Sequence, residues 1–185
     1  MTAIQVLSPC ETAPVPQPLT LAPRGELPAR ARLTLICNGK AKAREVLEML
    51  TDELRGALSI GAVELHSKPS AGIPLPADVA AELAQRSDLV VTALGDCGAC
   101  SAASLHDALQ FERHGVPATV VITDIFQRSV AAHARELGAE GYHTVVLPHP
   151  MSTRADERIR RCVRDAAAAA VEQLTAPARS AQAVA

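Results

Sequence analysis

Asp88-Leu89-Val90-Val91-Thr92-Ala93-Leu94 is an apolar run, and Gly95-Asp96-Cys97-Gly98-Ala99-Cys100-Ser101 follows it directly. The run has the length and composition of a buried strand, and the glycines after it predict a turn into a helix. A helix N-terminus presents unpaired backbone N–H groups and a partial positive charge. A thiol held there ionises more easily, and the thiolate is the form that attacks, exchanges with disulfides or binds metal. We therefore expect the chemistry of this chain at Cys97 and Cys100.

Apolar runs of the same kind recur along the chain. Strands are predicted at residues 32–37, 62–66, 88–94, 118–123 and 144–147. A helix is predicted after each strand. The evidence is apolar residues that recur at helical spacing or, after the second strand, Pro76, which suits the first turn of a helix. Gly115 and Gly138 mark the ends of two of these helices. The alternation predicts an α/β fold, a doubly wound five-stranded parallel sheet in the flavodoxin-like order 2-1-3-4-5.

This strand order places a binding crevice between the first and third strands, at their carboxyl ends. The loops there are Asn38-Gly39-Lys40 and the turn that carries Asp96 and Cys97. The topology thus points to the cysteine motif independently of any argument from cysteine chemistry. Gly39 allows close approach of the backbone, and Lys40 offers a cation to an anionic substrate or a thiolate. A solvated lysine on an ordinary turn is the alternative for Lys40.

The other strands also end in polar residues. These are Lys68 after the second strand, Thr123 and Asp124 after the fourth, and His149 after the fifth. Two prolines flank His149 and restrict its backbone, which suits a positioned acid or base, although a surface histidine is the alternative. With Asp96, Gly98 and Ser101 of the cysteine turn, these residues complete the predicted site. For Asp96 we expect a cap on its own turn, and for Ser101 and Ser104 caps on the helix.

Composition limits the class of protein. A net charge of −2 and the few aromatic residues (Phe111, Phe126 and Tyr142) argue against a nucleic-acid partner. No apolar run is long enough for a membrane span, and the N-terminus lacks the layout of a signal peptide. An odd number of scattered cysteines, five in all, favours reduced thiols in the cytoplasm over a disulfide framework. No second cysteine pair completes a zinc site, so we predict neither a metal nor a cofactor.

Domain organisation is predicted to be simple. Residues 1–30 form a proline-rich extended arm, residues 31–176 the α/β domain, and residues 177–185 a flexible tail of small residues. Apolar side chains in the arm suit packing on the body or on a neighbouring subunit of a homo-oligomer. A disordered leader is the alternative.

The ordered set of motifs resembles the UGSC (seleno)protein family, named for a selenocysteine-Gly-Ser-Cys motif. The resemblance spans most of the chain and is carried by Gly95–Cys100, Asn38–Lys40, Ser104–Ala108, Gly115–Pro117, Thr123-Asp124 with Phe126, Pro148–Pro150, and Leu21–Arg24. It implies that Cys97 stands at the selenocysteine position, where nucleophilic or redox power is needed. Two positions depart from the motif: Cys97 is sulfur, and the motif serine is Ala99.

These observations favour a thiol-dependent enzyme acting on a small, anionic or electrophilic molecule. Cys97 is the expected nucleophile, and His149 is expected to move a proton. Cys100 either resolves a disulfide, with a thiol reductant as partner, or supports a covalent, non-redox lyase or hydrolase. A non-catalytic thiol or sulfur carrier, or a binding subunit of a larger enzyme, is the alternative from another class.

Overall fold

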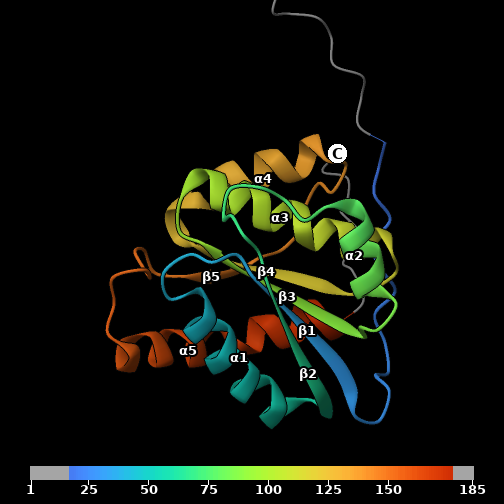
Figure 1. Cartoon of the computed structure of the whole chain (residues 1–185), viewed down its shortest axis with the longest axis horizontal. Helices are drawn as coiled ribbons and strands as arrows, with labels where there is room; N and C mark the ends of the chain where they lie inside the picture. Colours follow the sequence, from blue (N-terminus) through green and yellow to red (C-terminus); the bar gives the residue numbers. More distant parts are fainter. Residues whose placement is uncertain (1–16, 177–185) are drawn as a thin grey trace, which may run out of the picture.

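The computed structural model describes residues 17–176, which build one five-stranded sheet between two layers of helices (Figure 1). All neighbouring strands pair in parallel, in the order β2-β1-β3-β4-β5. The strands are β1 (Ala31–Cys37), β2 (Ile60–Ser67), β3 (Leu89–Gly95), β4 (Ala118–Thr123) and β5 (Val145–Leu147). The predicted fold and strand order are therefore confirmed, and strand ends differ from the expected ones by two residues at most.

Five α-helices connect and cover the strands. They are α1 (Ala43–Ala57), α2 (Ala77–Ala84), α3 (Gly98–Arg113), α4 (Gln127–Glu136) and α5 (Asp156–Thr175), and a short 3-10 turn, η1 (Asp124–Phe126), precedes α4. In Figure 1, α1 and α5 lie below the sheet, and α2, α3 and α4 lie above it. Right-handed crossovers between parallel strands produce this two-sided cover.

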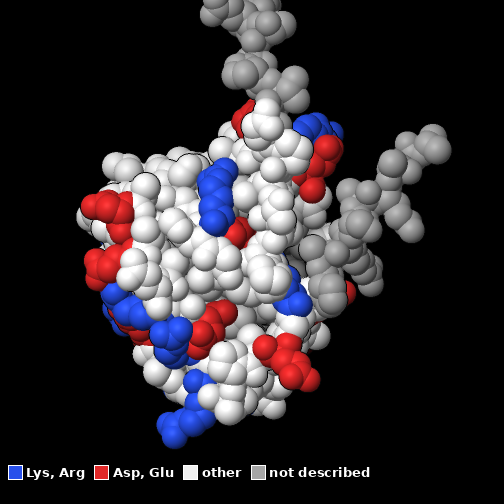
Figure 2. All heavy atoms as spheres, turned by 90° about the vertical axis from the view of Figure 1, so that its right-hand side faces the viewer, with Lys and Arg blue, Asp and Glu red and all other residues white. Residues whose placement is uncertain are grey.

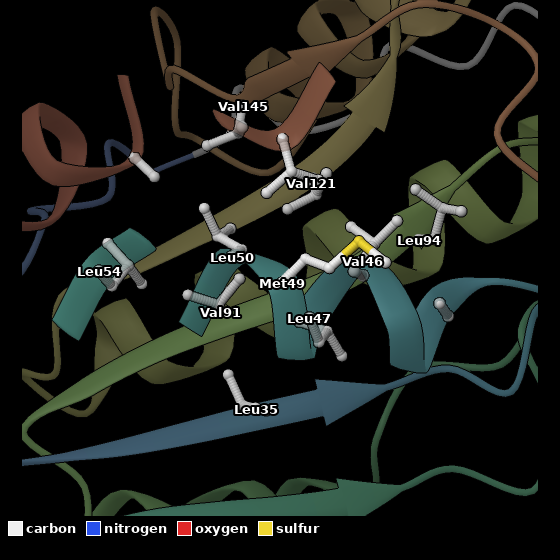
Figure 3. Close-up of a cluster of buried hydrophobic side chains, with 14 of the residues drawn as sticks. Leu35, Val46, Leu47, Met49, Leu50, Leu54, Val91, Leu94, Val121 and Val145 are labelled. Atoms are coloured by element: carbon white, nitrogen blue, oxygen red, sulfur yellow. The ribbon is translucent and has the colours of Figure 1, made fainter. Parts of the chain in front are cut away.

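Alternating strand residues supply a hydrophobic core on each face of the sheet, as the period of two requires. Val91 belongs to the core under α1 and α5, whereas its neighbour Val90 belongs to the core under α2, α3 and α4. Figure 3 shows the first core, where Leu50 of α1 lies beside Val91 and Val121, and Val46 lies beside Leu94. The central strands β3 and β4 are buried along their whole length. They therefore hold the turns at their ends in fixed positions.

The helices begin and end largely where the sequence predicts. Pro76 is the N-cap of α2, and Gly115 and Gly138 follow α3 and α4 with φ of 76° and 79°. Only glycine adopts such angles without strain. Phe126, expected inside a helix, belongs instead to η1.

Residues 17–30, the described part of the predicted arm, contain no helix or strand and lie on the domain. Leu19 N–H donates to Gly138 O, and Ala22 N–H donates to Glu112. Arg24 also bonds to the Glu112 carboxylate, and both side chains are almost fully buried. This segment thus packs on the α/β domain, which is one of the two arrangements expected for the arm. The rest of the predicted arm and the predicted tail lie outside the described residues.

Figure 2 shows the end of the molecule at which the strands begin, opposite the cysteine turn. Acidic and basic side chains lie there in small groups of both signs around a largely uncharged centre. The face in view therefore offers no extended basic surface.

Within residues 17–176, no helix combines the length and the apolar character needed to cross a membrane.

Candidate functional site

Cys97 occupies the N-cap position of α3, with φ −154° and ψ 167°. Its Sγ accepts the backbone N–H of Cys100 over 3.2 Å, which is the role that a capping oxygen has in other helices. The side chain is partly exposed. The aligned peptide dipoles of the sixteen-residue helix and this N–H both stabilise negative charge on Cys97 Sγ.

Cys100 lies on the inner side of the same turn and is fully buried. Its Sγ donates to the backbone oxygen of Cys97 over 3.2 Å. Burial, then the hydrogen bond to Cys97 and the negative charge there, raises the pKa of the Cys100 thiol to about 11. Cys100 is therefore a neutral thiol at physiological pH, and its backbone N–H is the group that it offers to Cys97.

Asp96 connects the cysteine turn to the loop after β5. Its Oδ1 lies 3.1 Å from His149 Nδ1, and its two oxygens accept the N–H groups of Met151 and Ser152, each over 3.0 Å. Burial opposes ionisation, but hydrogen bonds, chiefly from Ser152 and Met151, outweigh it and hold the pKa of Asp96 below its usual range. The expectation that Asp96 caps its own turn is wrong, because its acceptors are taken by a distant loop.

His149 is held from three sides. Its Nδ1 lies 3.0 Å from Thr123 Oγ1 as well as close to Asp96, and its N–H donates to Asp124 Oδ1 over 3.2 Å. The ring of Phe126 packs edge-on against the imidazole, with 5.7 Å between centroids. Positions predicted separately as site residues thus form one cluster around His149.

The hydrogen bonds assign the proton on His149 to Nδ1. Thr123 has one hydroxyl proton, which it donates to Gly95 O over 3.2 Å, so its oxygen accepts from Nδ1. The ionised Asp96 carboxylate only accepts. The Thr123 oxygen and the nearby carboxylate therefore both favour N–H at Nδ1, which leaves Nε2 as the nitrogen that takes a proton.

Asn38 supports the site from within the protein. It is 1% exposed, its amide N–H donates to Leu94 O and Ser104 Oγ, and its Oδ1 accepts the N–H of Lys40. It fixes the turn after β1 against β3 and α3. Gly39 has φ 76°, which this turn requires of it.

The three lysines of the chain are placed differently. The side chain of Lys68 is 1% exposed and its Nζ is paired with Asp107, and Lys42 is paired with Glu45 and Asp156. Within residues 17–176, Lys40 Nζ forms no ion pair. The cation at the carboxyl edge that is available to a ligand is therefore Lys40, whereas Lys68 has a counter-charge inside the protein.

The two glycines of the cysteine turn differ in their surroundings. A Cβ at Gly95 would lie 2.8 Å from both Ile122 Cγ2 and Ser101 Oγ, whereas one at Gly98 would meet no atom of residues 17–176 within 4 Å. Ser101 is not a cap as expected: its hydroxyl donates to Cys97 O over 2.6 Å. Ser104, also expected as a cap, bonds instead to Asn38.

Several residues that shape the site were not singled out from sequence. Asp107 accepts from Lys68 Nζ and from the N–H of Leu75, and Arg154 donates to the backbone oxygens of His149 and Pro150. Asp107 had a detectable signal, since a charge among the apolar helix positions of Leu105 and Leu109 needs a buried partner. Arg154 had no such signal, because it lies in a loop whose sequence shows no periodic pattern.

Four cysteines are free thiols in the described part of the chain: Cys37, Cys97, Cys100 and Cys162. No group of three or more His, Cys, Asp or Glu side chains there is arranged to hold a metal ion.

Comparison with known proteins identifies one family. The model described as the UGSC family matches residues 5–176, nearly the whole chain. No curated protein matches. Among solved structures, a diflavin flavoprotein A3 from Nostoc sp. is 16% identical, with a TM-score of 0.42, over 79% of this chain and 97% of that one. Similarity at that level says nothing about function.

Proposed function

The chain belongs to the UGSC family, and from that premise we propose that it is a thiol-dependent enzyme whose nucleophile is Cys97. One observation carries the proposal. Cys97 Sγ caps the N-terminus of α3 and accepts the Cys100 N–H, while the preceding residue, Asp96, holds His149. A thiol at a helix N-terminus and an imidazole positioned through the residue before it, at the same edge of the sheet, are the groups that nucleophilic cysteine catalysis needs.

The reaction class that fits best is covalent and non-redox. His149 Nε2 takes the proton of the Cys97 thiol, and the thiolate then forms a bond to an electrophilic carbon of a small molecule. The bond to the leaving group breaks, and His149 returns the proton to that group. Water, deprotonated by the same nitrogen, then attacks the carbon and releases Cys97 as thiolate. Lys40 holds a negative charge of the substrate.

Cys100 has a supporting role in this scheme. In a redox cycle its sulfur would attack Cys97 Sγ in a mixed disulfide, release the substrate as a thiol, and leave a disulfide for a thiol reductant. Its burial and its pKa of about 11 make Cys100 a poor attacking group at neutral pH. This favours the non-redox scheme. A cytoplasmic location suits either, because free thiols persist in a reducing compartment.

Iodoacetamide labelling tests the nucleophile. At pH 7, with peptide mapping, Cys97 of the full chain should be alkylated before Cys10, Cys37 and Cys162. Cys97→Ser should abolish this fast labelling and leave the melting temperature nearly unchanged, because serine is similar in size. If Cys97 is labelled no faster than the other cysteines, the assignment fails.

A second measurement separates this enzyme from a sulfur carrier. The mass of the protein as isolated should equal that of the sequence, and Cys100→Ser should slow turnover without abolishing it. An added mass of one sulfur atom on Cys97 would instead favour a carrier. Complete loss of turnover in Cys100→Ser would favour the redox cycle.

A further inference from the structure

A cavity of ≈ 320 Å³ lies beside the cysteine turn, between the loop after β2, α3 and α4. Gly72 and Pro74 line it from the loop, and Leu137 lines it from the end of α4. On α3 it is lined by Ala99, Ala102, Ala103 and His106, which follow one another at helical spacing along one side of the helix. It begins at Ala99, the second residue after Cys97.

The cavity has a fixed wall. Asp107 accepts from Lys68 Nζ and from the N–H of Leu75, and so holds both ends of the loop that carries Gly72 and Pro74. Gln110 also donates to Leu75 O over 3.1 Å. The Asp107–Lys68 pair is buried, so the loop is attached to α3 from inside the protein. The space beside Ala99 is therefore built into the fold.

His106 is the polar group of the α3 wall. Its Nδ1 is buried, and no hydrogen-bond partner for it exists among residues 17–176. An orphaned lone pair is more readily tolerated than an orphaned N–H, so the hydrogen lies on Nε2. Burial lowers the pKa of His106 and keeps the ring neutral at pH 7. Because the Nδ1 edge is buried, the Nε2 edge is the one that lines the cavity.

We propose that this cavity binds an apolar arm of the substrate and that His106 Nε2–H donates to an oxygen at the end of that arm. The inference rests on the proposed role of Cys97, since the arm extends from the carbon that Cys97 attacks. The walls from the loop and from α3 are apolar apart from His106, which suits an uncharged arm. The polar residues that line the cavity from α4, His133 and Glu136, lie within hydrogen-bond distance of each other (Nδ1 to Oε2, 3.3 Å).

The dimensions define the substrate class. His106 follows Cys97 by nine residues, about 13 Å along the helix axis, and helical side chains lean back toward the N-terminus. An arm of about five to seven carbon-sized atoms, together with its bond to Cys97 and a hydrogen bond to His106, therefore spans the distance between the two side chains. The substrate is a small electrophile with a short aliphatic chain that ends in an ether, carbonyl or hydroxyl oxygen.

Alkylating probes of matched length test this. Iodoacetamide, N-pentyl-iodoacetamide and N-(3-methoxypropyl)iodoacetamide react identically, since the sulfur–carbon bond forms as iodide leaves. Cys97 of the full chain should react with both N-substituted probes at least about tenfold faster than with iodoacetamide. The ether probe should react faster than the pentyl probe, because only the ether accepts from His106.

Variants assign these differences to the cavity. Ala102→Leu fills it and should remove the advantage of both arms, whereas the same change at exposed Ala168 of α5 should not. His106→Phe should remove the difference between ether and pentyl, and His106→Gln, which keeps a donor, should retain it. Equal rates for all three probes, or an advantage that survives Ala102→Leu, would overturn the inference. Slow labelling of Cys97 by iodoacetamide itself would instead overturn the proposed function.

Discussion

Asp96 Oδ1 and His149 Nδ1 lie 3.1 Å apart, and the same carboxylate accepts two N–H groups from the loop that carries His149. The residue before the proposed nucleophile, Cys97, thus positions both the imidazole and its loop. This couples the turn after β3 to the turn after β5 across β4. The coupling explains how the Asp96 carboxylate can precede a thiol proposed to ionise: its charge is directed to these donors.

Asp96→Asn should change the tautomer of His149. An amide in place of the carboxylate no longer favours N–H at Nδ1, so the proton should distribute between Nδ1 and Nε2. The ¹⁵N shifts of the imidazole report this directly. Asp124→Asn is the control, because within residues 17–176 Asp124 Oδ1 accepts only the backbone N–H of His149. The same tautomer in wild type and Asp96→Asn would contradict the assignment.

Cys100 should make stability depend on pH in the alkaline range. The pKa of its thiol is raised in the folded protein, from about 9 to about 11. A raised pKa stabilises the fold fully below the unfolded value, and this contribution is lost as pH rises through the folded value. The free energy of unfolding should therefore fall between about pH 9 and 11.

Cys100→Ser provides the comparison, since serine does not titrate there and its hydroxyl can still donate to Cys97 O. Urea unfolding at several pH values should show a shallower alkaline decline for the variant. If the free energies of unfolding of the two proteins fall in parallel with pH, Cys100 has the same pKa in the folded and the unfolded state.

The buried ion pair of Arg24 and Glu112 should be the main attachment of the segment before β1. The Glu112 carboxylate accepts from Arg24, from the N–H of Ala22 and from the N–H of Ala118. Glu112→Ala leaves a buried guanidinium without its counter-charge, which costs about 3–5 kcal/mol. For a domain of this size the melting temperature should fall by roughly 6–20 °C.

Glu140→Ala is the matched control. Glu140 pairs with Arg135 at the surface, where the two side chains are 69% and 68% exposed. Its melting temperature should change little. A similar loss in both variants would show that burial does not distinguish the two pairs.

The sheet was predictable because its signals are local. Short apolar runs, each followed by a helix, leave few parallel topologies, and the carboxyl edge then gathers Cys97, Thr123 and His149. The contacts of His149 with Thr123 and Asp96 follow from that placement. That these residues lie in one cluster of loops could therefore be predicted without knowing where their side chains point.

The partners of individual side chains were not predictable in this way. Whether Asp96 bonds to its own turn or to Met151 depends on how the loop after β5 returns over the sheet, and that loop has no periodic pattern. Lys68 was predicted to face a ligand, but the rotation of α3 about its axis places Asp107 against it. Such pairings are set by tertiary packing between segments distant in sequence.

Gly95 and Gly98 should respond oppositely to alanine. At Gly95 the new Cβ would lie 2.8 Å from Ile122 and Ser101, so Gly95→Ala should cost about 1–3 kcal/mol and lower the melting temperature by several degrees. At Gly98 the Cβ enters open space, and alanine is the better helix former, so Gly98→Ala should be at least as stable as wild type.

The same Gly98→Ala variant tests the approach to Cys97. If substrate approaches Cys97 over Gly98, the added Cβ narrows the path, and alkylation of Cys97 should slow although the fold is intact. Thermal melts and iodoacetamide rates on both variants test this, and an unchanged rate in Gly98→Ala would place the approach to Cys97 elsewhere.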